Sequence, residues 1–538
     1  MPNRSGTRRP NFLLIMTDQH RVDHMGCYGN RIVQTPNLDG LAARGTRFDN
    51  CYVSSGVCMP NRATLMTGRT PTVNGVQTNG LSLPLDSNTF VHMLRDNGYS
   101  TALYGKSHLQ NLVNIPIGPE NYPDLPSGDR AAKAFMDAIR GERAGPMFEN
   151  ERMDLWQKDH NRDVAVPYYG FDDVKLVLGH DETSLGHYFA WLKQHHADPL
   201  SLLGPKNALP AEGFSAPQVW RTKVPEELYP TAFIEQQTLD FLDAHAKSGG
   251  DQPFFIQASF PDPHHPFSPP GKYFDMYDPA DCAPPPSFNA EIANAPPLRQ
   301  RLIEQAAAGK RDLRVAAFAC SESEVREYLA LTYGMITMVD DAAGRILRKL
   351  SDLGLAEDTV VIFTSDHGDL MGDHGLMFKH CFHDEGITHV PLIWADPEQP
   401  QARTADALTG TIDIASMVLG RAGIAGYHGM QGHDVLAMLD KDETPPRAGI
   451  MVEEDELPTN ANCEQYLRTR TFVTERWRMT YWLEHGFGEL YDRREDPQEI
   501  HNLWDEPSAA GDKNELLERM LVEKFKLDNM APVAPYCA

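Results

Sequence analysis

Two apolar stretches of the sequence end in the same kind of side chain. FLLIMT leads into Asp18 and Gln19, and VVIFTS leads into Asp366 and His367. In open α/β sheets, residues beyond the carboxyl ends of the strands share one crevice, so we expect both pairs to lie together. Carboxylate and amide oxygens with an imidazole nitrogen can bind a divalent cation such as Ca²⁺, Mg²⁺ or Mn²⁺. A single Asp at a strand end is more often a cap or turn residue, but two matched pairs favour a metal site.

A cysteine at the start of a predicted helix is the second chemical element. Cys58 opens the segment CMPNR, and the helix that follows is predicted to begin at Pro60. The positive end of the helix dipole would favour a thiolate nucleophile at this position. A buried structural cysteine is the alternative for the residue taken alone. The pattern Cys-x-Pro-x-Arg, completed by Arg62, separates the two interpretations.

This pattern, downstream of an N-terminal strand that ends in Asp, resembles the signature of the type I sulfatases. In that family a formylglycine-generating enzyme oxidises the cysteine after translation, and the hydrated aldehyde is the nucleophile. The similarity continues in the order of the family through NFLLIMTDQHR, TPNLDGLAARGTRFDNCYV, SSGVCMPNRATLMTGRTP, GYSTALYGKSHL, FPDPHHPF, LTYGMITMVDDAAGRIL, FTSDHGDLMGDHGLMFKH and GELYDRREDPQEIHNLW. The resemblance implies an alkaline-phosphatase-like α/β core with a small C-terminal antiparallel subdomain.

The resemblance also implies a role for each matching residue. The family's ligands for one divalent ion, Ca²⁺ or Mn²⁺, match Asp18, Gln19, Cys58 as formylglycine, Asp366 and His367. Besides Cys58, the catalytic positions match Arg62, Lys106, His108, His264 and Lys379. Of these, Lys106, His264 and Lys379 are the expected substrate-binding residues. His265 is adjacent to His264, but the frame Pro-His-x-Pro favours His264.

These residue types suit the hydrolysis of a small anionic sulfate ester. Charge builds on the equatorial and leaving oxygens of the transition state, where a cation and two lysines would stabilise it. One hydroxyl of the hydrated aldehyde would attack sulfur while His264 protonates the leaving alcohol. His108 would then remove the proton of the second hydroxyl, which releases sulfate and regenerates the aldehyde. The resemblance therefore implies an arylsulfatase-type sulfuric ester hydrolase.

The metal pairs depart from the commonest family pattern. Many sulfatases have Asp-Asp in place of Asp18-Gln19, and Asp-Asn in place of Asp366-His367. The change removes one formal negative charge and adds a nitrogen ligand, which shifts the preference from Ca²⁺ towards Mn²⁺. Phosphonate monoester hydrolases, which also use formylglycine, share these pairs but lack the Lys-x-His that GKSH retains. We rank sulfatase first and phosphonate monoester or phosphodiester hydrolase second.

Two alternatives come from other classes. A non-catalytic binding protein of the same fold would be expected to have lost a catalytic residue, and none is lost. A two-zinc phosphatase would need a Ser or Thr nucleophile and further His and Asp ligands. Cys58 in its motif argues against the second alternative.

Short apolar runs alternate with segments of helical period, which predicts an α/β fold with a mostly parallel sheet covered by helices. The predicted strands are residues 12–16, 100–104, 254–260, 360–364 and 390–394. Helices are expected within 35–45, 87–98 and 321–350. The Pro-interrupted segments 111–225 and 261–300 fit neither period, so we expect loops and short helices there that set substrate selectivity.

From about Arg468 the sequence changes to alternating strands followed by a final helix, which predicts a small antiparallel sheet with one covering helix. We therefore divide the chain into a catalytic α/β domain, residues 1–440, and a C-terminal subdomain with a tail, residues 441–538. The tail KLDNMAPVAPYCA could reach a neighbouring subunit, which leaves a homo-oligomer open.

Composition restricts the partners and the compartment. The 538 residues include 49 Lys and Arg against 75 Asp and Glu, a net charge of −26 that disfavours nucleic acid and anionic membranes. No apolar run suits a signal peptide or reaches the roughly 18 residues of a membrane span. The eight cysteines are scattered without CxxC spacing, as is usual for reduced thiols. We expect a cytoplasmic protein.

Overall fold

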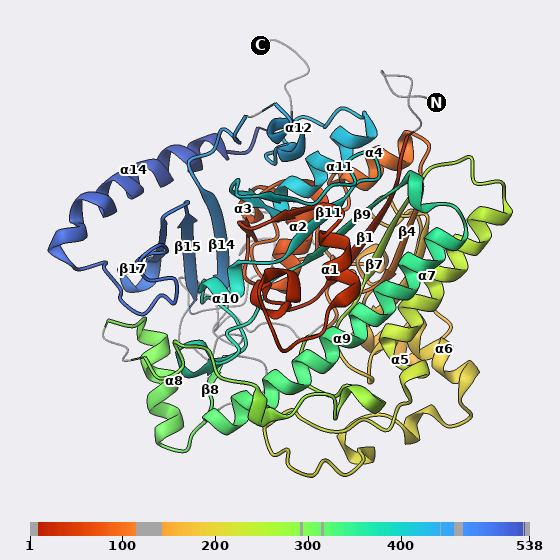
Figure 1. Ribbon diagram of the computed structural model, residues 1–538, viewed down its shortest axis with the longest axis horizontal. Coiled ribbons are helices and arrows are strands. Elements are labelled where there is room, and N and C mark those ends of the chain that lie inside the picture. The colour runs from red at the N-terminus through yellow and green to blue at the C-terminus, as the bar shows by residue number, and fades with distance from the viewer. Residues whose placement is uncertain are drawn as a thin grey trace, which may run out of the picture.

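A nine-stranded sheet lies at the centre of the computed structural model (Figure 1), in the order β12-β2-β11-β9-β1-β7-β4-β5-β6. The structure describes residues 9–113, 143–290, 294–311, 313, 317–441, 443–456, 466–530 and 532. The strands of the sheet are β1 (Asn11–Thr17), β2 (Thr46–Phe48), β4 (Ser100–Gly105), β5 (Asp173–Leu178), β6 (Leu185–Gly186), β7 (Phe254–Ser259), β9 (Thr359–Ser365), β11 (Leu392–Ala395) and β12 (Arg403–Ala405). Strands β9, β1, β7, β4 and β5 are parallel, which confirms the predicted α/β class.

Strand β1 shows why the central strands are apolar on both faces. Leu14 and Met16 pack in one core with α2 (Cys58–Thr67), α4 (Phe90–Asp96) and α11 (Ile414–Ala422). Leu13 and Ile15 pack in the opposite core with α1 (Pro36–Ala42), α6 (His187–His195), α7 (Pro230–Lys247) and α9 (Glu322–Asp352). Because helices cover both faces, every residue of β1 is buried. In Figure 1, α7 and α9 run across the near side of this sheet.

The long helix α9 agrees closely with its sequence signals. Ser321 caps the first turn by accepting a hydrogen bond from the Glu324 N–H, and the Glu324 carboxylate accepts one from the Ser321 N–H. The helix is followed by β9, as predicted. Helices α1 and α4 also lie within the predicted ranges.

Segment 111–225 was wrongly predicted to hold only loops and short helices. Strand β5 pairs with β4 in parallel, and β6 and α6 follow it. The apolar run VKLVL is short and follows two aspartates, so the surrounding polar sequence masked it. Strand β11 is a strand as predicted, but it runs antiparallel to β9 and β2.

A second sheet, β14-β15-β16-β17, forms the C-terminal region beside α14 (Figure 1). It comprises β14 (Ile450–Glu456), β15 (Leu467–Val473), β16 (Trp477–Trp482) and β17 (Phe487–Asp492), all antiparallel, and α14 is Ala510–Lys526. The last three strands and the helix were predicted. Strand β14 was not, because its sequence ends in the acidic run EEDE.

Apart from 3-10 helices, the remaining α-helices and strands of the described residues are short. They are α3 (Pro71–Asn74), α5 (Met153–Lys158), α8 (Pro297–Ala307), α10 (Glu385–Thr388), α12 (Val435–Leu439), β3 (Cys51–Tyr52), β8 (Phe318–Ala319), β10 (Leu376–Met377) and β13 (Thr409–Gly410). Within the ranges given above, no helix is long and apolar enough to cross a membrane. Most of the predicted oligomer-forming tail after Met530 lies outside the described residues.

Candidate functional site

The carboxyl ends of β1 and β9 place the two acidic pairs side by side. The strands are parallel neighbours with Thr17 opposite Ser365, so Asp18 and Asp366 emerge at the same edge. The Gln19 N–H donates to Asp366 Oδ1 at 3.1 Å, and Gln19 has a left-handed φ of 61° that turns the chain away from the strand. Asp18, Gln19, Asp366 and His367 are all buried.

Helix α2 brings Cys58 to this edge. It begins at Cys58 and not at Pro60 as predicted, so Cys58 itself is in the first turn. Asn61 fixes the helix, because its Nδ2 donates to the Asp366 carbonyl at 2.6 Å and its Oδ1 accepts from the Ser54 N–H. Cys58 Sγ then lies 3.1 Å from His367 Nε2 and 3.8 Å from Asp18 Oδ1. Asn61 lies inside the motif but was not among the predicted site residues.

The donor set at this edge suits a divalent cation. One ligand atom each from Asp18, Cys58, Asp366 and His367 lies within 4.8 Å of the others, and all four side chains are buried. Two carboxylates with an imidazole favour a hard or borderline ion. Gln19 lies beside this group, and its Oε1 accepts a hydrogen bond from Lys379 Nζ at 2.8 Å. The metal positions predicted from the sequence are therefore brought together.

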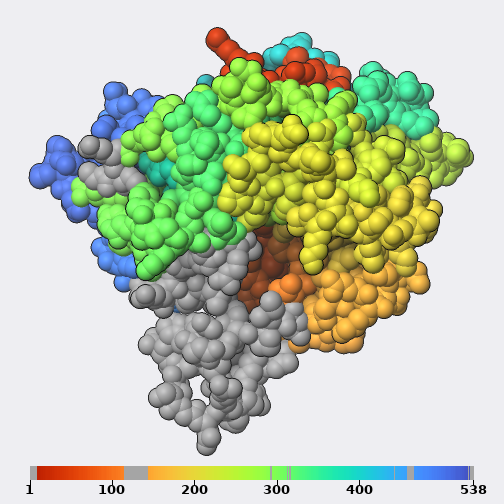
Figure 2. Space-filling view, turned by 90° about the horizontal axis from the view of Figure 1, so that it is seen from below, coloured from red at the N-terminus to blue at the C-terminus, as the bar shows by residue number. Residues whose placement is uncertain are grey.

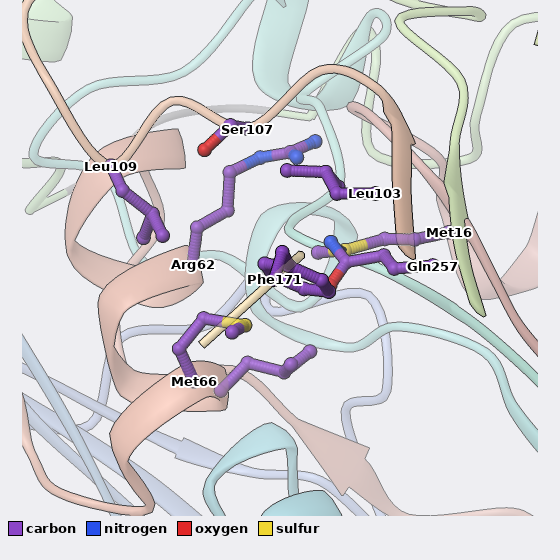
Figure 3. Close-up of a pocket in the computed structure, with 9 residues that line it drawn as sticks. Met16, Arg62, Met66, Leu103, Ser107, Leu109, Phe171 and Gln257 are labelled. Atoms are coloured by element: carbon purple, nitrogen blue, oxygen red, sulfur yellow. Dashed lines mark hydrogen bonds between the residues drawn. The ribbon is translucent and has the colours of Figure 1, made fainter. Parts of the chain in front are cut away.

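Arg62 forms ion pairs with Asp366 and Asp18, and its hydrogen bonds go to residues other than Cys58. Its Nε donates to Asp366 Oδ2 at 2.7 Å, and its Nη1 donates to the Lys106 carbonyl and to Ser259 Oγ. Figure 3 shows a small cavity beside the Arg62 side chain, lined mainly by apolar residues together with Ser107 and Gln257. Its volume of about 10 Å³ is the size of one water molecule, so a substrate must approach from elsewhere.

Two lysines converge on the cysteine. Lys106 Nζ lies 3.7 Å and Lys379 Nζ 3.6 Å from Cys58 Sγ, and Lys106 also donates to the Asp18 carboxylate. Gly105 allows β4 to end here, since a side chain at its φ of 110° would collide with the Ser259 carbonyl. Burial raises the pKa of the Cys58 thiol, but Lys106, Lys379 and His367 outweigh burial and hold the pKa well below its usual value.

His108 is held by a carboxylate from a different segment. Its φ of 58° is left-handed, and the backbone N–H groups of His108, Leu109 and Gln110 all donate to the Glu151 carboxylate at 2.8 to 3.0 Å. Glu151 is fully buried. It lies in the segment predicted to be loops, and nothing in the sequence around it distinguishes it from a surface acid. The His108 side chain also contributes to the lowered pKa of Cys58.

The two adjacent histidines face different partners. His264 Nε2 lies 2.9 Å from Lys379 Nζ, and His264 Nδ1 donates to the His265 carbonyl. His265 Nδ1 lies 3.1 Å from Gln19 Nε2, and its ring stacks on Phe378. Burial, His180 and Lys379 hold the pKa of His264 well below its usual value. His264 is therefore the histidine beside the lysine and the cysteine.

His180 is a further residue of the site and was not predicted from the sequence. It follows β5, its Nε2 lies 2.8 Å from Lys106 Nζ, and its ring stacks on His264 with centroids 3.8 Å apart and planes at 15°. Burial and Lys106 lower the pKa of His180 to about 4. The signal that could have found it is Gly-His-Asp directly after VKLVL, a third strand that ends in polar residues.

A cavity of about 420 Å³ adjoins His108 and His180. Its wall is mainly apolar or uncharged, with Met59, Asn79, Gly80, Asn111, Leu112, Val113, Met153, Gly179, Thr183 and Pro266, and Asp181 is its one acidic residue among those described. Figure 2 shows a hollow on the face seen from below, with N-terminal residues in red-brown at its bottom and orange and yellow segments along one side. These are the segments that line the cavity.

Comparisons with known proteins agree with this geometry. The model of the sulfatase family matches residues 10–117 and 189–424. A second model, described as N-sulphoglucosamine sulphohydrolase, C-terminal, matches residues 372–526. The chain is 29% identical to an uncharacterised sulfatase, YidJ, of Escherichia coli K12, over 96% of this chain and 87% of that protein.

Two further relatives cover almost the whole chain. An arylsulfatase of Clostridium perfringens is 27% identical over 92% of this chain and 90% of its own length. The crystal structure of a phosphonate monoester hydrolase of Agrobacterium radiobacter is 25% identical, with a TM-score of 0.73 over 97% of this chain and 96% of that one. This likeness confirms the fold that the sequence resemblance implied.

Proposed function

Because the chain belongs to the sulfatase family, we propose that it is an arylsulfatase-type hydrolase of sulfate monoesters whose nucleophile is a formylglycine made from Cys58. One observation carries the proposal: Lys106 and Lys379 both lie within 3.7 Å of Cys58 Sγ, beside a buried metal-type centre. Two fixed cations at the nucleophile suit an anionic ester whose charge grows on its equatorial oxygens. Maturation would require a formylglycine-generating enzyme as a partner.

The residues of the site would divide the work as follows. Asp18, Gln19, Asp366 and His367 would hold Ca²⁺ or Mn²⁺, which would supply positive charge next to the nucleophile. The formylglycine would supply, as its hydrate, one hydroxyl for attack on sulfur and a second for release of sulfate.

The proton transfers fall to the histidines. His264 Nδ1 donates to the His265 carbonyl, so Nε2 of the neutral imidazole accepts from Lys379 Nζ at 2.9 Å. The proton for the leaving oxygen would come from the Lys379 ammonium and pass through His264. His108, held through its backbone by Glu151, is placed to take a proton from the second hydroxyl. Arg62 keeps Asp366 oriented through the bond from its Nε.

The adjoining cavity supports an aryl group as the alcohol. Among the described residues of its wall, Met59, Leu112, Val113, Met153 and Pro266 offer apolar contacts, and no lysine or arginine is present. These described residues offer a polyanionic saccharide no lysine or arginine, whereas a compact apolar ring would be desolvated favourably.

A phosphonate monoester or phosphodiester hydrolase is the second candidate. The full-length similarity to a phosphonate monoester hydrolase favours it, and so do the pairs Asp18-Gln19 and Asp366-His367. Lys106 and His108 favour the sulfatase. Both substrate classes are tetrahedral monoanions, so we expect some activity of the enzyme on each.

Two measurements test the proposal. Peptide mass spectrometry at Cys58 should find the aldehyde, and kcat/KM should favour an aryl sulfate over the matching phosphonate and phosphodiester. A preference of about tenfold or more for the phosphorus esters, equivalent to about 1.4 kcal/mol in the transition state, would move the assignment to the second candidate. An unmodified Cys58 in fully active protein would exclude the formylglycine nucleophile.

A further inference from the structure

His180 touches two residues that the proposed mechanism uses separately. Its Nε2 lies 2.8 Å from Lys106 Nζ, and its ring face lies on the ring of His264. Lys106 would stabilise the sulfate oxygens, whereas His264 would pass a proton from Lys379 to the leaving alcohol. In the described part of the chain, no other side chain both bonds to Lys106 and stacks on the His264 ring.

We infer that His180 is a positioning residue that fixes the sulfate-binding lysine with its ring nitrogen and the leaving-group histidine with its ring face. The inference rests on the proposed function. It adds a residue that the motifs of the sequence do not include, on the loop between β5 and β6.

The nitrogen contact determines where the charge of Lys106 lies. A lysine ammonium has three donors on a flexible stem, so its position depends on the acceptors around it. The Asp18 carboxylate and His180 Nε2 are two such acceptors, and with both in place Nζ lies 3.7 Å from Cys58 Sγ. Without the imidazole, Lys106 would lose one of these two acceptors and keep the Asp18 carboxylate.

The ring contact determines how His264 is oriented. His264 donates from Nδ1 to the His265 carbonyl, which fixes one edge of the ring. The His180 ring, tilted by only 15°, covers one face of it and resists rotation out of this plane. Nε2 is thereby kept 2.9 Å from Lys379 Nζ, where the leaving oxygen must receive its proton.

His180 also forms part of the wall of the 420 Å³ cavity, next to Gly179 and Asp181. The residue therefore lies at the boundary between the charged site around Cys58 and the cavity proposed for the alcohol. The bond that breaks in an ester must cross this boundary, so displacement of His180 should affect the departure of the alcohol as well as the binding of sulfate.

Two substitutions separate the two contacts. His180→Phe keeps a ring against His264 and removes the acceptor for Lys106. His180→Gln keeps an acceptor for Lys106 and removes the ring. His180→Ala removes both. Each variant is compared with the parent by binding of inorganic sulfate, measured by calorimetry, and by kcat/KM for aryl sulfates whose phenols differ in acidity.

We expect His180→Phe to weaken sulfate binding and to lower kcat/KM about tenfold, by the same factor for every aryl sulfate. We expect His180→Gln to bind sulfate like the parent and to lose more activity as the phenol becomes a poorer leaving group. His180→Ala should show both effects.

His187 provides the matched control. It packs beside the same strand, where its Nδ1 accepts from the Leu176 N–H at 2.9 Å, and its Nε2 lies 3.0 Å from Asp163 Oδ1. His187→Phe should change the melting temperature without changing sulfate affinity or the dependence on the leaving group. The melting temperature and metal content of every variant show whether it is folded.

The outcomes distinguish the inference from the proposed function. If His180→Phe and His180→Gln bind sulfate equally and lose the same factor of kcat/KM on every ester, His180 has only a structural role and the inference is wrong. If the parent hydrolyses no sulfate ester, the proposed function fails. In that case sulfate binding by the parent and by His180→Phe still tests whether His180 positions Lys106. Weaker binding by His180→Phe would support the inference, and equal binding would contradict it.

Discussion

Two buried groups of acids and imidazoles lie near Lys379, and they are chemically alike but arranged differently. One is the group Asp18, Cys58, Asp366 and His367, and the other is His380, Glu454 and Glu456; in each group the ligand atoms lie within 4.8 Å of one another. In the second group the contacts are pairwise: His380 Nδ1 lies 2.8 Å from Glu456 Oε2, and the Cys381 N–H donates to Glu454.

The first group differs because two lysines converge on one of its atoms. Cys58 Sγ has Lys106 and Lys379 within 3.7 Å, whereas each carboxylate of the second group is matched to a donor from the 380–383 loop. Strand β14 thus holds the backbone that follows Lys379. The two groups therefore share residue types, and the proposed difference in their roles rests on the two lysines that lie beside Cys58.

The sharpest test of the comparison is removal of the nucleophile. Cys58→Ala should lower turnover about a thousandfold or more, with an unchanged melting temperature, because the residue contributes chemistry and little packing. Cys58→Ser has no second hydroxyl and should accumulate a stable ester on the side chain, visible by intact mass. A serine variant that turns over sulfate esters near the parent rate would contradict the formylglycine mechanism.

Removal of the divalent ion should have the second largest effect, and it should depend on the first group and not on the second. Chelation, Asp18→Ala or Asp366→Ala should release the divalent ion and lower kcat/KM about a hundredfold or more, since a cation at the reacting centre contributes several kcal/mol. Elemental analysis of the purified protein measures the ion. Glu456→Gln is the matched variant in the second group and should keep the full metal content. Full activity without a bound divalent cation would refute the site.

The second group should instead affect stability. Glu456→Gln removes the negative charge that pairs with the buried His380, which should lower the free energy of unfolding by about 3 kcal/mol in urea titrations. Glu475→Gln is the control, because Glu475 is 79% exposed and lies 3.8 Å from an exposed Arg494. Its effect should stay below about 1 kcal/mol. Equal effects of the two variants would show that the buried pairs of β14 do not stabilise the fold.

The smallest effect is a dependence of stability on pH. Burial lowers the pKa of His380, but Glu456 and Glu454 outweigh burial and the charge of Lys379 and raise the pKa above its usual value. The stabilisation is therefore complete below the ordinary histidine pKa and is lost as pH rises through the raised value. Urea unfolding of the parent and of His380→Gln should show a stability difference that shrinks as pH rises. A difference that does not change with pH would exclude this titration.

The two groups also differ in how far the sequence predicted them. Asp18 and Asp366 follow apolar strands, and Cys58 follows a recognisable motif, so position along the chain was enough to place them together. Glu454 and Glu456 belong to an acidic run that resembles solvated surface. Their partners His380 and His383 are 71 to 76 residues away, and only the folded chain brings them together.

The same limit explains the residues of the site that were missed. Glu151 acts through three backbone N–H groups, which have no signature in a sequence. His180 depends on β5, which was assigned to a loop because its apolar run is short. The predicted catalytic residues themselves carry recognisable patterns, so their convergence could be expected, whereas the side chains that orient them could not.

The burial of Cys58 has a consequence for the order of events during synthesis. Its side chain is 2% exposed, at the start of α2 and beneath strand ends that come from residues as distant as Ser365. In the proposed maturation, a modifying enzyme would have to reach the thiol before the sheet closes over it. Because closure needs contacts between remote parts of the chain, we expect it to be slow, and the time before it would set the period in which Cys58 can be oxidised. The active fraction of the protein should then depend on a race between folding and maturation, and faster folding would lower it.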